Sequence, residues 1–420
     1  MFTFSNKVKE LSEKALDIAK TEFEAIDSVT EYNQQKMLKA FIDNGVSESI
    51  FAESTGYGYG DRGREIIDRV FAQAVGAEDA LVRHNFTCGT HTLTVALFGI
   101  LRPGDTMLCV SGRPYDTIQP VIGISKNDKN MGSLADYGVK YEEIDLKNDR
   151  LDYEVIEERV SKGNVRMVYI QRSRGYKLRP SLSVEEIKKV IDITKKHTDA
   201  VVMVDNCYGE WTERMEPTDV GADIIAGSLI KNPGGGIAKT GGYIAGKREC
   251  IELCAYRLTT PGLGKEVGAT LGQSRELFMG IFNAPHVVGE ALRTAAFTSA
   301  LFSLMGYDPT PAVGETRHDI IQAVRLREEK NLIAFCQGLQ KGAPVDSFVT
   351  PEPWEMPGYD SKVIMSAGAF TLGSSIELSA DAPLREPFAV WLQGGLNFHS
   401  AKVAVMYAAQ EVLKVNGIGD

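Results

Sequence analysis

The stretch VVMVDNCYGEWTERMEPTDVGADIIAGSLIK, residues 201–231, is the part of the sequence that decides the fold. It contains two short apolar runs that are typical of buried strands. The first run ends in Asp205, and the second runs into Ser228 and Lys231. In a mostly parallel sheet, the residues that follow the strands meet at the carboxyl edge, where ligands bind. An acid and a lysine placed in such a crevice lose favourable hydration, so the pair indicates a functional site.

The chemistry of this pair predicts a cofactor. A lysine in a desolvated crevice is expected to lose proton affinity and to serve as an amine nucleophile. A carboxylate beside it can hold a cationic ring nitrogen. These are the two protein groups that pyridoxal phosphate requires. Taken alone, Asp205 is more readily a turn residue and Lys231 a solvated loop residue, but the two together, followed by the glycines at 234–242, favour the cofactor site.

The composition bounds the class of protein. The chain has 420 residues, 43% of them hydrophobic, which is enough for more than one domain. Its formal net charge of -10 and its lack of a long basic run argue against nucleic acid and membrane partners. The six cysteines form no paired CxxC motif and no HExxH occurs, so we predict no metal site. Reduced thiols and the absence of a signal-like apolar segment predict a cytoplasmic protein.

The order of apolar runs predicts an α/β fold. Strand-like runs alternate with helical patterns, which favours a mostly parallel, seven-stranded sheet with helices on both faces. Ser183 and Glu186 have the spacing of a capping box at the start of one such helix, and residues 115–122 are predicted to form another. The expected strands are 80–82, 106–110, 139–146, 165–171, 200–204, 224–230 and 242–245.

The remaining segments predict the domain organisation. Two amphipathic helices, 7–26 and about 30–41, form an N-terminal arm over residues 1–50, too small to fold alone. The cofactor-binding domain is predicted to span 51–285. A long helix over 273–305, kinked near Pro285, leads into a smaller α+β domain over 286–420, whose first helix is either 320–326 or 329–339.

Several further residues are candidate ligand contacts. Cys88, Gly89 and Thr90 open a helix after a strand, and the free N–H groups at such an end favour a phosphate. Tyr115 could stack on a flat ring, although a tyrosine at a helix start commonly serves packing. Arg385, within Pro-Leu-Arg-Glu-Pro, could clamp a substrate carboxylate or form a surface ion pair with Glu386.

The loop STGYGYGDRGRE, residues 54–65, interleaves glycines with aromatic and charged residues. Tyr57, Tyr59 and Arg62 could present a hydroxyl and a guanidinium to a ligand phosphate. A glycine-rich turn before a helix is an equally good interpretation of the same pattern.

A different class of protein is suggested by GGGIAKTG, residues 234–241. It approaches the P-loop pattern, and a nucleotide-phosphate-binding protein that uses Gly234 to Thr240, with Lys239, is therefore the alternative. However, Ala238 stands where the P-loop requires glycine. The S-x-x-K at Ser228 and the Lys-Thr-Gly at Lys239 also imitate β-lactamase motifs, but they lie too close together to belong to separate elements.

The blocks VVMVDNCYGE, SLIKNPGGGIAKTGGYIAG, STGYGYGDRGRE and SIELSADAPLREPFAVWLQGG together resemble the methionine γ-lyase-like family. Its members are often labelled aluminium resistance proteins or provisional cystathionine β-lyases. The resemblance covers nearly the whole chain and implies the fold of fold-type I pyridoxal phosphate enzymes. It implies that Lys231 carries the cofactor as a Schiff base, that Asp205 pairs with its ring nitrogen, and that Ser228 binds its phosphate.

The resemblance also implies roles for the other candidates. Gly89 and Thr90 would contact the phosphate through their backbone, beside Cys88, where related proteins often have serine. Tyr115 would stack on the ring, and Arg385 would hold the substrate carboxylate.

The same resemblance implies that a tyrosine and Arg62 reach the phosphate in a neighbouring subunit. In this chain two residues, rather than one, separate Tyr59 from Arg62, so that either Tyr57 or Tyr59 could act. The expected assembly is a homodimer or homotetramer with shared active sites.

The expected activity is that of a carbon–sulfur lyase on a sulfur-containing amino acid, by β- or γ-elimination. The same groups also support transamination, so a pyridoxal phosphate-dependent aminotransferase is the alternative within this class. Which amino acid is the substrate depends on the shape of the pocket.

Overall fold

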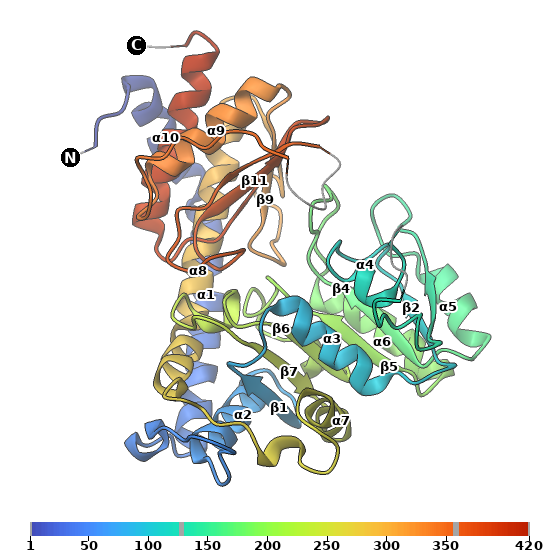
Figure 1. Cartoon of the computed structure of the whole chain (residues 1–420). Helices are drawn as coiled ribbons and strands as arrows, with labels where there is room; N and C mark the ends of the chain where they lie inside the picture. The colour runs from blue at the N-terminus through green and yellow to red at the C-terminus, as the bar shows by residue number, and fades with distance from the viewer. Residues whose placement is uncertain (1, 126–129, 356–360, 419–420) are drawn as a thin grey trace. The chain divides into compact units, whose positions relative to one another are not determined.

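The computed structural model of the chain describes residues 2–125, 130–355 and 361–418 (Figure 1). The chain divides into two compact units, one formed by Asn33–Asn283 and the other by Met1–Tyr32 together with Ala284–Asp420. The first part of the predicted N-terminal arm therefore groups with the C-terminal region. No helix in the described ranges has both the length and the apolar character that a membrane span needs.

The Asn33–Asn283 unit is built on a seven-stranded sheet with the order β1-β7-β6-β5-β4-β2-β3. The strands from β6 to β3 pair in parallel, whereas β7 runs antiparallel to both β1 and β6, so β1 and β6 point the same way. This confirms the predicted α/β fold. The strands are β1 Asp79–Arg83, β2 Thr106–Cys109, β3 Lys140–Glu143, β4 Met167–Gln171, β5 Val201–Asp205, β6 Ile224–Ser228 and β7 Gly242–Gly246.

Helices connect these strands. The predicted capping box forms at α6, where Ser183 Oγ accepts from the Glu186 N–H at 3.1 Å and Glu186 Oε2 accepts from the Ser183 N–H at 2.9 Å. The helix predicted over 115–122 is shorter, because Pro120 can only begin a helix and Gly123, at φ 90°, ends it. The helices are α2 Arg62–Ala74, α3 Gly89–Ile100, α4 Gln119–Ile122, α5 Tyr153–Ser161, α6 Val184–His197 and α7 Arg248–Leu258.

The central strands are buried throughout, which explains their unbroken apolar runs. Every residue of β5, β6 and β7 is buried. One apolar cluster joins the sheet to α3 and α7 and includes Leu93, Met203, Ile244 and Ile251. Parallel strands covered by helices read as continuous hydrophobic segments rather than as an alternation.

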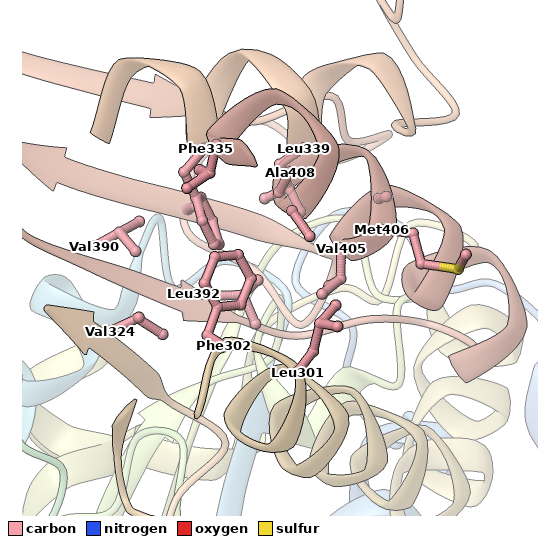
Figure 2. Close-up of a cluster of buried hydrophobic side chains, with 14 of the residues drawn as sticks. Leu301, Phe302, Val324, Phe335, Leu339, Val390, Leu392, Val405, Met406 and Ala408 are labelled. Atoms are coloured by element: carbon pink, nitrogen blue, oxygen red, sulfur yellow. The ribbon is translucent and has the colours of Figure 1, made fainter. Parts of the chain in front are cut away.

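The other unit contains a five-stranded antiparallel sheet with the order β10-β11-β12-β9-β8. Its helices pack on this sheet through a cluster that includes Phe302, Phe335, Leu392 and Val405 (Figure 2). The strands are β8 Asp308–Thr310, β9 Gln322–Arg325, β10 Val363–Ser366, β11 Ser379–Pro383 and β12 Ala389–Gln393. The long helices are α1 Asn6–Asp43, α8 Ser274–Leu304, α9 Glu329–Lys341 and α10 Phe398–Val415.

Two predicted elements differ from the structure. The N-terminal pair of helices is one continuous helix, α1, because no glycine or proline interrupts residues 6–43. The first of the two alternatives for a helix, 320–326, is wrong, since Gln322–Arg325 pairs with β12 as strand β9. The second alternative corresponds to α9, and the predicted long helix forms as α8 with Pro285 inside it.

Candidate active site

Lys231 follows the carboxyl end of β6, after Ser228, and its Nζ lies over the ring of Tyr208 at 4.1 Å from the centroid. A cation over an aromatic face is attracted by the negative charge density of the ring. Tyr208 has a left-handed backbone with φ 69°, a conformation that is strained for a tyrosine and common at functional sites. The turn after β5 therefore presents an aromatic face to the lysine.

Asp205 ends β5, the strand next to β6, and is buried with 6% of its surface exposed. Its carboxylate accepts from the Cys207 N–H at 3.2 Å and from the Tyr169 hydroxyl at 3.4 Å. Burial raises the pKa of Asp205, and the positive charge of Lys231 opposes that shift. The structure thus places the predicted acid and the predicted lysine within electrostatic reach of each other, in a desolvated place.

The prediction that Lys231 loses proton affinity is wrong for the chain without a ligand. Burial alone lowers the pKa of Lys231, but the acidic groups of Cys207, Tyr208 and Asp205 outweigh burial and raise it above the ordinary lysine range. A neighbouring negative charge favours the ammonium form more than desolvation disfavours it. In the folded chain these neighbours therefore favour the ammonium form of Lys231.

A buried polar network supports the turn that carries Tyr208. Arg172, directly after β4, is fully buried and donates to Asn206 Oδ1 at 2.8 Å and to Glu213 Oε1 at 2.7 Å. Glu216 accepts from Asn206 Nδ2 at 2.9 Å and pairs with Arg172 at 3.4 Å. These hydrogen bonds and ion pairs restrain the segment between β5 and η2 (Pro217–Val220).

Glu210 is a second buried carboxyl close to Lys231. It has no exposed surface, and its Oε1 accepts from the Tyr243 hydroxyl at 2.7 Å, while Oε2 has no hydrogen-bond partner among the residues that the structure describes. Burial raises the pKa of Glu210 to about 8, and Lys231 acts in the opposite direction. At neutral pH, Glu210 is therefore largely protonated and adds little charge to the site.

The helix start predicted to receive a phosphate lies against Ser228. A Cβ added at Gly89 would come within 3.3 Å of Ser228 Cβ, so the two backbones approach more closely than a larger side chain allows. Cys88 caps α3, its Sγ accepting from the His91 N–H at 3.4 Å. Thr90 Oγ1 lies 2.8 Å from the Thr117 hydroxyl. Ser228 and the N-terminus of α3, which were both predicted to contact the phosphate, thus lie against each other.

Tyr115 belongs to the same edge of the sheet. Its N–H donates to Gln171 Oε1 at 2.7 Å, and Gln171 is the last residue of β4. The acidic hydroxyl of Tyr115 also contributes to the raised pKa of Lys231, which places the tyrosine in the surroundings of the lysine. Tyr115, Asp205, Ser228 and Lys231 therefore gather at the carboxyl edge, as the sequence predicted.

These residues fit pyridoxal phosphate. The glycine cradle at Gly89 leaves room for a phosphate beside Ser228 and the N–H groups of α3. Asp205 offers a buried carboxylate suited to a cationic ring nitrogen, and the half-buried Lys231 offers an amine. Lys231 would hold the carbonyl carbon of the cofactor, Asp205 its ring nitrogen and Ser228 its phosphate.

Tyr57, Tyr59 and Arg62 lie on the surface of the Asn33–Asn283 unit. The two tyrosine rings stack on each other, with centroids 5.5 Å apart, and are 71% and 64% exposed. Arg62, the first residue of α2, is also exposed. These three side chains are oriented toward solvent in the described chain, where a second subunit could meet them, and their role stays a prediction.

Arg385 belongs to the other unit, in the turn between β11 and β12. Its N–H donates to the Pro383 carbonyl at 2.9 Å, and its carbonyl accepts from the Phe388 N–H at 2.8 Å. The side chain is exposed. Its predicted contact with a substrate carboxylate stays a prediction.

The segment proposed for nucleotide binding lacks the geometry of a P-loop. Lys239 is exposed and pairs with Glu276 at 2.8 Å. The glycines before it form a short 3₁₀ turn, η3 (Asn232–Gly234), and the chain continues into β7 rather than into a helix. A P-loop requires a helix N-terminus directly after its lysine.

Sequence reasoning missed the residues that support the site. Arg172, Tyr208 and Glu210 carry the network, the aromatic face and the second buried carboxyl, respectively. A signal for Arg172 was present, since an arginine that directly follows a buried strand sits at the edge where ligands bind. Nothing in the sequence marks the left-handed backbone of Tyr208, because a tyrosine rarely adopts it.

Comparison with known proteins identifies the family. The chain matches the Methionine gamma-lyase family over residues 8–413. It is 44% identical to the uncharacterized protein YnbB of Bacillus subtilis (strain 168), over 93% of this chain and 92% of that protein.

Two solved structures are similar to the whole chain. One is a carbon-sulfur lyase involved in aluminum resistance from Clostridium novyi NT, with 49% identity, a TM-score of 0.93 and 96% coverage of each chain. The other, from Clostridium acetobutylicum, is provisionally named a cystathionine beta-lyase involved in aluminum resistance. It has 50% identity and a TM-score of 0.93, and the similarity covers 97% of this chain and 96% of that one. The match over nearly the full length, together with the lysine and aspartate at the carboxyl edge of the sheet, shows that this chain belongs to the methionine gamma-lyase family.

Proposed function

We propose that the protein is a pyridoxal phosphate-dependent carbon–sulfur lyase that acts on a sulfur-containing amino acid. The observation that carries this proposal is the pairing of the buried Asp205 with the half-buried Lys231 at adjacent strand ends, with Gly89 close against Ser228. The family, and the carbon-sulfur lyase named among its similar structures, support the same activity.

Each residue of the chain has a distinct task in this proposal. Pyridoxal phosphate, when bound, supplies a carbonyl carbon for the substrate amine and a ring that withdraws electrons from the substrate α-carbon. Asp205 would hold the ring nitrogen through its carboxylate, which would then have a partner other than Lys231. Relieved of that carboxylate, Lys231 Nζ can release its proton and act as the base that takes the α-proton.

The remaining contacts orient the substrate and the cofactor. The N–H groups at the start of α3 and the Ser228 hydroxyl would hold the phosphate, and the ring of Tyr115 would pack on the cofactor ring. Arg385 binds the α-carboxylate of the substrate through two parallel hydrogen bonds. Expulsion of a thiol from the β- or γ-carbon then gives a 2-oxo acid and ammonia after hydrolysis.

We further propose a cytoplasmic homodimer or homotetramer. The support is the exposed, stacked pair Tyr57 and Tyr59 beside Arg62, three groups that can donate to the phosphate of a neighbouring subunit. In that assembly each site would be completed by a second copy of the chain.

The test is a product assay on the purified, cofactor-loaded protein with cystathionine, methionine and cysteine. A lyase releases thiol, 2-oxo acid and ammonia in equal amounts without a second substrate. An aminotransferase forms a 2-oxo acid only when an acceptor 2-oxo acid is added, and no thiol appears. The same assay with Lys231→Ala should lose product formation by at least a thousandfold, because the base that takes the α-proton is gone.

A further inference from the structure

The loops that follow β2 and β4 meet at the carboxyl edge of the sheet, because these two strands are parallel neighbours. The loop after β2 carries Tyr115, and the loop after β4 carries Tyr176. Their rings lie against each other, with centroids 6.1 Å apart and planes inclined at 41°. The proposed mechanism uses Tyr115 but gives no task to Tyr176.

Gln171, the last residue of β4 and the strand partner of Asp205, joins the two loops through its side chain. Its Oε1 accepts from the Tyr115 N–H at 2.7 Å, and its Nε2 donates to the Ser173 carbonyl at 3.1 Å. The two ends of this amide cannot be exchanged, because the N–H group needs an acceptor and the carbonyl needs a donor. One side chain therefore restrains both loops.

The main chain of Gln171 is held as well. Its N–H donates to Ser111 Oγ at 2.8 Å, and its carbonyl accepts from Arg179 Nη2 at 2.9 Å. Arg179 is 2% exposed and also donates to the Ser173 carbonyl, at 2.6 Å. Gln171 is thus restrained in both its main chain and its side chain, which gives Tyr115 a firm point of attachment.

Gly175 brings the loop after β4 up to the ring of Tyr115. Its φ of 57° lies in the left-handed region, which glycine adopts without strain. A Cβ added at Gly175 would lie 3.5 Å from Tyr115 Cδ2 and 3.5 Å from Gln171 Nε2. The main chain of this loop therefore passes beside the Tyr115 ring, and the next residue, Tyr176, adds its own ring to the contact.

The contact between the two rings bears on how Tyr115 would meet a flat ligand. Both tyrosines are half-buried, so the surrounding core alone does not enclose either ring. An aromatic pair at this separation and tilt is attractive and favours one orientation of each ring. A ring that is already oriented loses less conformational freedom when a ligand stacks on it, and this favours binding.

We propose that Tyr176 is a positioning residue of the cofactor site: together with Gln171, it holds the ring of Tyr115 in the orientation that would stack on pyridoxal phosphate. This inference rests on the proposed function, since it assumes that Tyr115 packs on the cofactor. Tyr176 acts through Tyr115 and has no contact of its own with the cofactor or the substrate in this proposal.

The test measures two properties of the full chain. One is the dissociation constant of pyridoxal phosphate, from absorbance titration of the apoprotein. The other is the circular dichroism of the visible band per molecule of bound cofactor, which responds to the orientation of aromatic rings around the chromophore. Tyr176→Ala should weaken cofactor binding about fivefold, the loss expected for one aromatic contact, and should also reduce the visible circular dichroism. Tyr176→Phe keeps the ring and should restore both properties.

A double-mutant cycle tells whether Tyr176 acts through Tyr115. In the Tyr115→Ala background, Tyr176→Ala should change the cofactor affinity by less than about twofold, because the ring that Tyr176 positions is absent. Gln171→Met removes both amide contacts at a similar side-chain length. It should weaken cofactor binding about threefold in the unchanged background and should likewise have little effect beside Tyr115→Ala.

Tyr137→Ala is the matched control. Tyr137 also pairs with an aromatic ring, that of Phe98 at 5.9 Å, but it precedes β3 and so lies toward the amino edge of the sheet. Its replacement should leave the cofactor affinity and the visible circular dichroism unchanged. Melting curves of the apoproteins show whether each variant is folded, and Tyr176→Leu takes the place of Tyr176→Ala in the cycle if the alanine variant fails to fold.

Three results would each overturn the inference: an unchanged cofactor affinity in Tyr176→Ala, additive effects of the Tyr115 and Tyr176 substitutions, or a Tyr176→Phe variant that binds as weakly as Tyr176→Ala. A wild-type protein that takes up no pyridoxal phosphate would be a different outcome. It would refute the proposed function, and this inference would fall with it.

Discussion

Replacement of Arg172 by methionine should unfold the protein at a markedly lower temperature. Arg172 has no exposed surface, and its guanidinium is the partner of Asn206, Glu213 and Glu216. Methionine fills part of the space but leaves the Glu216 side chain, 1% exposed, without its cation. Removing one member of a buried ion pair costs about 3–5 kcal/mol.

The expected shift in melting temperature follows from the size of the unit. About 1 kcal/mol corresponds to roughly 2–4 °C for a domain of this length, so the melting temperature should fall by about 6–20 °C. Because the network fixes the turn that carries Tyr208, the apoprotein variant should also take up pyridoxal phosphate more weakly. Thermal unfolding followed by circular dichroism, and an absorbance titration with the cofactor, measure the two effects.

Two controls make the result interpretable. Arg150→Met breaks an ion pair of 3.0 Å with Glu186 in which the arginine is 59% exposed, and it should cost less than about 1 kcal/mol. The double variant Arg172→Met/Glu216→Gln should recover part of the loss, since no unpaired carboxylate remains. If Arg172→Met melts within 3 °C of Arg150→Met, the network does not carry the stability assigned to it.

Two further predictions concern the groups around the cofactor site. Burial raises the pKa of Glu210 from 4.5 to about 8, so between these pH values the folded chain holds a proton that the unfolded chain releases. The stability that this proton contributes to folding is complete below pH 4.5 and is lost as the pH rises toward 8. Glu210→Gln should therefore flatten the loss of stability between pH 5 and 8 in urea unfolding curves, and an unchanged slope would contradict the raised pKa. Gly89→Ala puts a methyl group 3.3 Å from Ser228 Cβ. It should weaken cofactor binding about tenfold, equivalent to about 1.4 kcal/mol, with little change in melting temperature. An unchanged affinity for the cofactor would show that Gly89 does not belong to the phosphate site.

The sequence predicted the edge of the sheet better than it predicted the behaviour of the groups there. Asp205 and Lys231 could be found because each follows an apolar run, and parallel strands bring their carboxyl ends together. The proton affinity of Lys231 could not be predicted from the sequence, since it depends on the ring of Tyr208 and on acidic groups that lie around the amine only in the folded chain. The position of a residue after a strand is a local property, whereas a pKa is a sum over spatial neighbours.

Helix lengths and the supporting residues show the same limit. Residues 27–30 resemble the start of a new helix, but α1 continues through them because no residue there forbids the helical backbone. Residues 320–326 have an apolar pattern that fits either period, and pairing with β12 decides for a strand. Tyr176 attracted no attention beside Tyr115, because the two rings meet only where the loops after β2 and β4 come together in the folded chain.

The measurement that tests the central claim most directly is a visible absorption spectrum of the purified protein and of Lys231→Ala, each after incubation with pyridoxal phosphate and gel filtration. The account predicts a yellow protein whose visible band disappears on borohydride reduction, with the cofactor then covalently attached to the peptide that contains Lys231. The variant should show no borohydride-fixed cofactor. A protein that stays colourless after incubation, or a Lys231→Ala variant that still fixes the cofactor on reduction, would contradict the account.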